Sequence, residues 1–227
     1  MRTLLLVLAM TVVVAGASLA ATATIDVYEG WNLIAAPLVP FDPDPQSVLS
    51  GAADGIEDGL LSRVDPIWGG IEYDPWDDAF GNILLGDGYW LYAFTNGQTL
   101  TYNGVEDGVP DTTGKKTDMW ISLPGLGEDG AWHIVGYPFA TDSAVDSGNG
   151  EGDIIKFTDG TDVKTWGEAV DAGWVDATMY GQSAYGGFDV TMDGWGTDDS
   201  LRAGNAYQFL TFVPNIAMII PAPADAN

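Results

Sequence analysis

The chain has 227 residues, no cysteine, one histidine and 33 acidic against 7 basic residues, which gives a formal net charge of −26 at neutral pH. The lack of cysteine excludes disulfides, thiolate metal sites and a cysteine nucleophile, and one histidine excludes sites that need two. A negative field of this size argues against nucleic acid and anionic membranes as partners.

The first twenty residues have the pattern of an export signal. Arg2 is followed by an apolar run over 4–14 and by small residues at 17–20. This pattern predicts a signal peptide over 1–20, a secreted, extracellular or cell-surface location, and no membrane insertion after cleavage. Without Arg2 the mature chain has 33 acidic and 6 basic residues, a net charge of about −27.

An internal repeat organises the rest of the chain. The sequence WNLIAAPL from Trp31 recurs as WHIVGYPF from Trp132, and GDGYWLYAF from Gly86 matches GNAYQFLTF from Gly204. The match predicts two diverged copies of one module, over 21–106 and 118–227, joined by a linker at 107–117. The second copy has extra residues between its landmarks, where 163–170 is typical of a short helix.

Alternating apolar residues and frequent Gly and Pro predict an all-β, hairpin-rich fold, sandwich- or barrel-like in each copy. The strand at 89–94 is apolar on both faces and is therefore expected to be central. Asn96-Gly97 predicts a tight turn after it, with 99–102 as its hairpin partner. Further hairpins are expected between 60–64 and 70–73 and between 177–180 and 187–190.

The repeat also predicts which side chains are equivalent. Trp31 and Trp132 are expected at equivalent buried positions, as are Tyr89 and Tyr207. His133 takes the place of Asn32 and is interpreted as a hydrogen-bonded strand histidine.

Apolar strands are also expected near both ends of the mature chain, at 24–28 and 216–220. Strands at chain ends commonly lie at sheet edges, where unpaired backbone groups accept a neighbour. Two interpretations stay open: pairing within the chain, or strand exchange with another subunit.

The landmarks Gly30-Trp-Asn-Leu-Ile, Pro37-Leu-x-Pro, Gly86-x-Gly-Tyr-Trp and Trp132-x-Ile-Val-Gly-x-Pro-Phe resemble a duplicated β module of secreted bacterial and archaeal multidomain proteins. The resemblance implies an extracellular location and this architecture, with no defined activity. Ala206-Tyr207-Gln208 departs from the Gly-Tyr-Trp of that pattern.

One glycine-rich loop has the oxygen ligands that Ca²⁺ prefers. The candidate ligands are Asp146, Asn149, Glu151 and Asp153. The loop lacks EF-hand spacing, because Gly148 and Phe157 stand where acidic ligands are required. A structural Ca²⁺ site and a flexible solvated loop are both compatible with this sequence.

Three tryptophans lie in Gly- and Asp-rich stretches outside the strands: Trp68, Trp76 and Trp195. Exposed rings at these positions would bind carbohydrate or mediate self-association, whereas buried ones would only pack. Trp90 and Trp174, like Trp31 and Trp132, lie in strand-like sequence and are expected in the core.

These observations predict a non-catalytic extracellular structural protein. Self-assembly into a homo-oligomer or polymer, as a surface-layer, sheath or filament subunit, is the first interpretation, and a carbohydrate-binding or adhesive module is the alternative. A glycosidase using a carboxylate pair such as Asp74 with Asp77 ranks third, because a chain with 33 acidic residues produces such pairs by chance.

Overall fold

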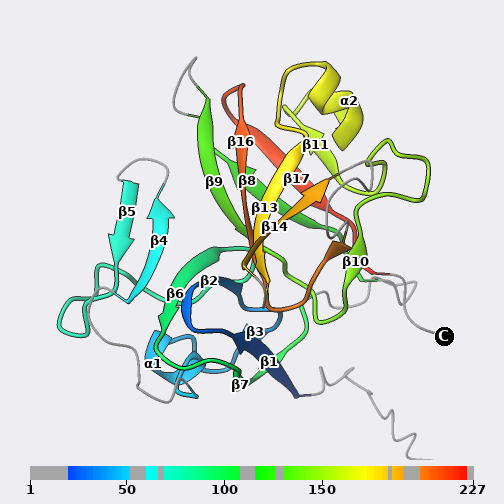
Figure 1. The fold of residues 1–227 in the computed structure, drawn as a ribbon. Coiled ribbons are helices and arrows are strands. Elements are labelled where there is room, and N and C mark those ends of the chain that lie inside the picture. The colour runs from blue at the N-terminus through cyan, green and yellow to red at the C-terminus, as the bar shows by residue number, and fades with distance from the viewer. Residues whose placement is uncertain are drawn as a thin grey trace, which may run out of the picture.

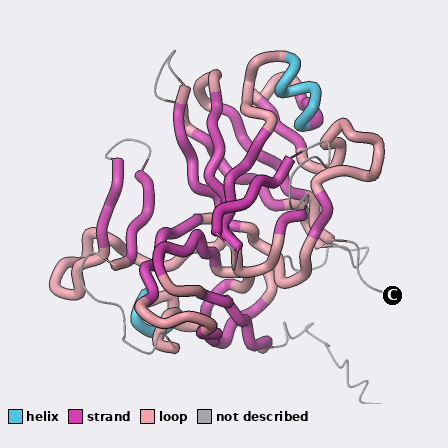
Figure 2. The backbone as a smooth tube through the Cα atoms, viewed as in Figure 1, coloured by secondary structure: helices cyan, strands magenta, loops and turns pink. Residues whose placement is uncertain are grey.

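The computed structural model describes residues 20–51, 60–65, 69–107, 116–125, 130–183, 186–191 and 200–223. The predicted signal peptide therefore lies outside the described residues, apart from Ala20. The fold is all-β, as predicted, and the described residues also form two short helices (Figures 1 and 2). None of the helices in the described ranges is long and apolar enough to cross a bilayer.

Among its described residues, the first half of the chain forms seven strands and one helix. These are β1 (Ala21–Val27), β2 (Gly30–Ala35), β3 (Val39–Pro40), α1 (Pro45–Val48), β4 (Leu61–Asp65), β5 (Gly69–Glu72), β6 (Gly88–Ala93) and β7 (Gln98–Val105). They build a three-stranded sheet in the order β1-β7-β3 and a four-stranded sheet in the order β2-β6-β4-β5. Ile25, Ile34, Tyr89 and Leu100 from both sheets share one core, so this half is a two-layered β structure.

The described part of the second half forms ten strands and one helix. These are β8 (Met119–Leu123), β9 (Ala131–Gly136), β10 (Ser143–Ala144), β11 (Lys156–Thr158), β12 (Val163–Thr165), α2 (Trp166–Asp171), β13 (Thr178–Ser183), β14 (Gly186–Thr191), β15 (Ser200–Leu201), β16 (Ala206–Thr211) and β17 (Ile216–Ile220). They build the sheets β12-β11-β17-β8 and β14-β13-β16-β9, and the small pair β10-β15. This half has a separate core that includes Phe157, Phe209 and Met218.

The two halves share a common strand order, to which the second half adds β12 and the pair β10-β15. The sheet β2-β6-β4-β5 corresponds to β9-β16-β13-β14, and β1-β7-β3 corresponds to β8-β17-β11. The register agrees as well, because Trp31 pairs with Tyr92 where Trp132 pairs with Leu210. The duplication inferred from the landmarks is therefore present in the topology.

A buried tyrosine is used in the same way in both halves. The hydroxyl oxygen of Tyr89 accepts a hydrogen bond from the backbone N–H of Leu84 at 2.8 Å, and that of Tyr207 accepts one from Arg202 at 2.7 Å. Both rings are almost fully buried, as predicted. The equivalence extends from the strands to the loops that precede them.

The predicted hairpin through Asn96-Gly97 is wrong. β6 pairs with β2 and β4, whereas β7 pairs with β1 and β3 in the other sheet. The segment between β6 and β7 thus carries the chain from one layer to the next. Both strands find other partners, so the turn sequence alone did not determine the pairing. The other two predicted hairpins, β4-β5 and β13-β14, are present.

The predicted short helix is present, with a shifted start. The Thr165 hydroxyl accepts a hydrogen bond from the Glu168 N–H, and the Glu168 carboxylate accepts one from the Thr165 N–H. This capping box begins α2 at Trp166. The preceding residues 163–165 pair with β11 as β12 instead.

Both terminal strands pair within their own chain. β17 lies between β11 and β8, so neither of its edges is open, and β1 pairs with β7 along its whole length. The prediction that both strands lie at sheet edges is thus correct for β1 and wrong for β17.

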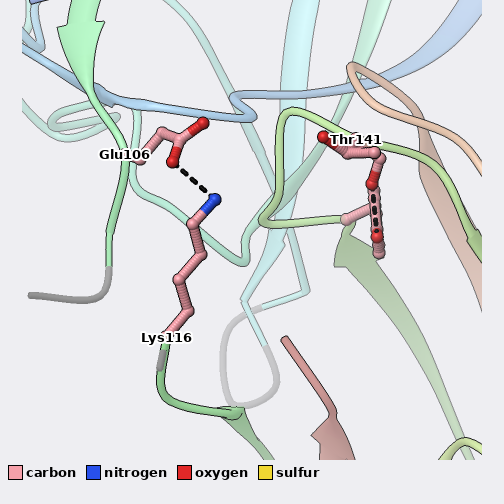
Figure 3. Close-up of polar contacts among 4 residues, drawn as sticks. Glu106, Lys116 and Thr141 are labelled. Atoms are coloured by element: carbon pink, nitrogen blue, oxygen red, sulfur yellow. Dashed lines mark hydrogen bonds and ion pairs between the residues drawn. The ribbon is translucent and has the colours of Figure 1, made fainter. Parts of the chain in front are cut away.

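The predicted linker at 107–117 connects β7 to β8. An ion pair closes its ends, with Nζ of Lys116 2.6 Å from Oε2 of Glu106 (Figure 3). Both side chains are partly exposed, so the pair contributes little to stability. Residues 108–115 lie outside the described ranges.

The sheets β2-β6-β4-β5 and β14-β13-β16-β9 meet at a pseudo-twofold axis. The N–H of Ala35 donates to the carbonyl of Gly204 at 2.9 Å, and the equivalent N–H of Gly136 donates to the equivalent carbonyl of Gly86, also at 2.9 Å. The bridges Ile34 to Asn205 and Asp87 to Val135 are related in the same manner. Each half thus presents the same surface to the other, as subunits do in an isologous dimer.

Small residues allow the backbones to approach at this axis. Ala35 is equivalent to Gly136, and Gly88 is equivalent to Ala206. A Cβ on Gly136 would overlap the carbonyl oxygen of Asp87 and lie 2.7 Å from the Cβ of Ala35. A Cβ on Gly88 would lie 2.7 Å from the Cβ of Ala206. The close contact leaves room for only one methyl group in each pair.

We therefore expect Gly136→Ala to lower the free energy of unfolding by about 1 to 3 kcal/mol, the usual cost of overpacking. Gly70→Ala is the matched control, because a Cβ on this strand glycine has no atom within 4 Å. That variant should be as stable as the wild type or gain about 0.5 kcal/mol from reduced chain entropy in the unfolded state. Equal stability of the two variants in urea unfolding would contradict the tight contact.

Candidate functional site

A cluster of aromatic side chains lies on one face of β2 and β6 in the first half. We define patch 1 as Trp31, Tyr92 and Phe94. The Trp31 and Tyr92 rings are 5.4 Å apart at 76°, and the Tyr92 and Phe94 rings are 5.1 Å apart at 72°. Trp31 is 42% exposed and Phe94 is 50% exposed. Exposed aromatic clusters of this kind mark interaction surfaces.

The second half has an equivalent cluster on β9 and β16. We define patch 2 as Trp132, Leu210 and Phe212, which occupy the positions of Trp31, Tyr92 and Phe94 in the repeat. Trp132 is 49% exposed, Phe212 is 42% exposed, and Tyr180 of β13 extends the patch, with its ring 6.1 Å from that of Trp132. The molecule thus carries two related apolar patches.

The prediction that Trp31 and Trp132 are buried is wrong, although their equivalence is correct. Alternation along β2 places Asn32 and Ile34 on the core face and Trp31, Leu33 and Ala35 on the other face. The other half covers Leu33 and Ala35, while Trp31 lies beyond this contact. Trp90 and Trp174, also expected in the core, are only partly buried.

Equivalent polar residues occupy the core side of the same strands. The Asn32 side chain is buried and exchanges hydrogen bonds with the backbone of Tyr28, at 2.9 and 2.7 Å. His133 is 7% exposed, and its Nε2 lies 3.0 Å from Oγ1 of Thr211. Burial lowers the pKa of His133 from 6.5 to about 4, so the ring is neutral at physiological pH.

A small cavity of about 100 Å³ lies where β4, β8 and β9 meet, lined in part by Val64, Asp87, Trp132 and His133. Burial raises the pKa of the Asp87 carboxyl, opposed by the charge of Arg63 and by a hydrogen bond with Tyr89. Ligand pockets for drug-sized molecules usually have volumes of about 300 Å³ or more. The cavity has room for a few water molecules and does not favour a substrate site.

The four predicted calcium ligands lie in one loop, where the carboxylates of Asp146 and Asp153 accept hydrogen bonds from the loop itself. The Asp146 carboxylate accepts hydrogen bonds from four backbone N–H groups at 148–152. The Asp153 carboxylate accepts from the Ser147 N–H and hydroxyl and from Asn149. These hydrogen bonds stabilise the conformation of the loop by themselves.

The pKa values follow from these contacts. Partial desolvation raises the pKa of Asp146, but the four backbone hydrogen bonds outweigh it and lower the pKa overall. The hydrogen bonds from Ser147 lower the pKa of Asp153. In the described part of the chain, no three His, Cys, Asp or Glu side chains are grouped to hold a metal ion. Calcium binding by this loop stays a prediction.

We expect the unfolding temperature to rise in about 1 M NaCl, because a Debye length of about 3 Å screens the repulsion of a chain with net charge −26. Thermal melts in EDTA, in about 5 mM CaCl₂ and in NaCl of matched ionic strength separate screening from specific binding. A gain in CaCl₂ above the NaCl control that is lost in Asp153→Asn would assign Ca²⁺ to the loop. An unchanged midpoint in every solution would contradict the role of charge.

The predicted carbohydrate residues are only partly described. Trp68 and Trp195 lie outside the described residues. Trp76 is 90% exposed in a turn after β5, where its N–H donates to the Asp74 carboxylate at 2.8 Å. Asp74 and Asp77 form a backbone bridge with each other across a turn, which agrees with their interpretation as turn residues.

Patches 1 and 2 were not predicted as a site. The available signal was the alternation along 30–35 and 88–93, which places Trp31, Tyr92 and Phe94 on one side of the sheet. The patches contain no carboxylate, amine, imidazole or thiol, and what they offer chemically is apolar contact together with the phenol groups of Tyr92 and Tyr180. No protein-family model matches this chain, and neither a curated protein nor a solved structure shows significant similarity to it.

Proposed function

We propose that the protein is a non-catalytic extracellular structural subunit that associates with copies of itself. The observation that carries the proposal is the pair of exposed, equivalent apolar patches, one in each half. A subunit that must contact two neighbours needs two such surfaces, whereas a monomeric scaffold has no need of exposed tryptophan at two equivalent positions. The export signal predicted over 1–20 supports the extracellular location.

The geometry of patch 1 favours a protein partner over a sugar. Its rings meet edge to face, at 76° and 72°, and Trp31 also meets Trp90 at 90°. Rings turned against one another form a compact apolar surface rather than a flat platform. Sugar rings stack best on ring faces that lie open and roughly coplanar.

Carbohydrate binding is the second candidate, favoured by the high exposure of Trp76. A glycan array with the mature protein tests it, and Trp76→Ala is the matched variant. Binding that is lost in this variant would support the carbohydrate interpretation.

Association is tested by sedimentation velocity and negative-stain microscopy of the mature protein in EDTA, in about 5 mM CaCl₂ and in about 1 M NaCl. The contact is apolar and the chains repel one another, so we expect larger species as ionic strength rises. A protein that stays monomeric under all three conditions, at the highest concentrations reached, would refute self-association.

A further inference from the structure

The two patches continue the contact that already joins the halves. On β2, Trp31 lies on the same face as Leu33 and Ala35, which pack with Ala206 and Ile134 of the second half. On β9, Trp132 lies on the same face as Ile134 and Gly136 at the same contact. One part of each sheet face is covered by the other half, and the adjoining part is open.

The contact between the two halves shows which kind of surface binds to these sheet faces. The face of the first half binds the face of the second half through equivalent hydrogen bonds, Ala35 to Gly204 and Gly136 to Gly86. Both faces carry the same types of residues, and the residues that define the patches are uncharged. A second copy of the chain therefore offers an apolar surface of matching chemistry. At these uncharged patches two copies can make contact, whereas their acidic surfaces elsewhere repel each other.

We propose that patch 1 of one chain binds patch 2 of the next, so that the chain polymerises head to tail. This inference rests on the proposed self-association and specifies its surfaces. A contact between two different patches does not close on itself, so it propagates into a ring or an open filament, with two contacts for each subunit. A contact of patch 1 with patch 1 would instead be isologous and would close into a dimer, an outcome that the variants below distinguish from the head-to-tail contact.

Two double variants test the proposal: Trp31→Ser with Phe94→Ser disables patch 1, and Trp132→Ser with Phe212→Ser disables patch 2. All four side chains are between 42% and 50% exposed, so the variants should retain the fold, which circular dichroism melts verify. The control is Trp76→Ser, which removes a more exposed tryptophan outside both patches.

We expect each double variant alone to stop at the monomer in about 1 M NaCl, with association weakened on the order of 30-fold or more, as for loss of central aromatic contacts. An equimolar mixture of the two variants should form dimers, because one retains patch 1 and the other retains patch 2. The Trp76→Ser protein should polymerise like the wild type. Should a double variant fail to fold, the single variants Phe94→Ser and Phe212→Ser are mixed in the same way.

Four results would overturn the proposal. Dimers of a double variant on its own would show contact between like patches, and a mixture that stays monomeric would show that the patches do not bind each other. Double variants that polymerise like the wild type would place the contact elsewhere and leave the proposed function intact. A wild type that never associates would instead refute the proposed function, and this inference with it.

Discussion

Replacing Trp166 by alanine should lower the free energy of unfolding by about 3 to 5 kcal/mol, the cost of removing a fully buried large aromatic side chain. Trp166 begins α2, is completely buried in the core of the second half, and its Nε1–H donates to the Asp176 carbonyl at 2.8 Å. The variant loses apolar packing and leaves a cavity, and it deprives that carbonyl of a hydrogen bond.

The separate cores of the two halves give this prediction a second readout. Trp166 belongs to the core of the second half, while the first half packs around Tyr89 and Phe80. In urea, the second half should therefore unfold before the first, and unfolding curves from circular dichroism and tryptophan fluorescence should separate. Trp76→Ala, at a 90% exposed site, is the control and should change stability by no more than about 0.5 kcal/mol. A Trp166→Ala protein with an unchanged midpoint would contradict the assigned core.

His133 should make the protein less stable as the pH falls below neutrality. Burial lowers the pKa of His133 to about 4, whereas in the unfolded chain it has its ordinary value of 6.5, so below pH 6.5 the unfolded state binds a proton that the folded state does not. The contribution of neutral His133 is complete above pH 6.5 and is lost progressively toward pH 4. The loss amounts to about 2 kcal/mol between pH 7 and pH 5 and about 3 kcal/mol by pH 4.

The natural control for this effect is His133→Asn, because asparagine occupies the equivalent position 32 in the first half. Asp87, whose pKa burial raises, and the loop carboxylates titrate in both proteins, so the difference between the two pH profiles isolates His133. Urea unfolding at intervals from pH 7 to pH 5 should give a steeper loss for the wild type. Parallel profiles would show that His133 is accessible to protons in the folded state.

The sequence predicted the features that depend on local pattern. The landmarks at Trp31 and Trp132 gave the correct equivalence, and their register is the same in both sheets. The central position of β6 followed from its two apolar faces, and a short helix was predicted near α2, although the capping residues that set its start were not identified. Such patterns report on neighbours along the chain or on direct pairing partners.

Features that depend on distant contacts were not predicted. The turn at Asn96-Gly97 resembles a hairpin turn, but β7 pairs with β1, a partner more than seventy positions away at Ile25 and Leu100. Whether Trp31 is covered depends on how far the second half extends over β2, which no pattern within 30–35 contains. The candidate site therefore became visible only when both halves were placed together.

The pseudo-twofold contact is tested most directly by nuclear Overhauser effects between the halves. Its close pairs are the Ala35 methyl with the Gly136 α protons and the Ala206 methyl with the Gly88 α protons. In each pair, one group belongs to the first half and the other to the second half. We predict a cross-peak for both pairs in the mature monomeric protein. Assigned resonances without either cross-peak would contradict the arrangement, and with it the two equivalent patches on which the proposed assembly depends.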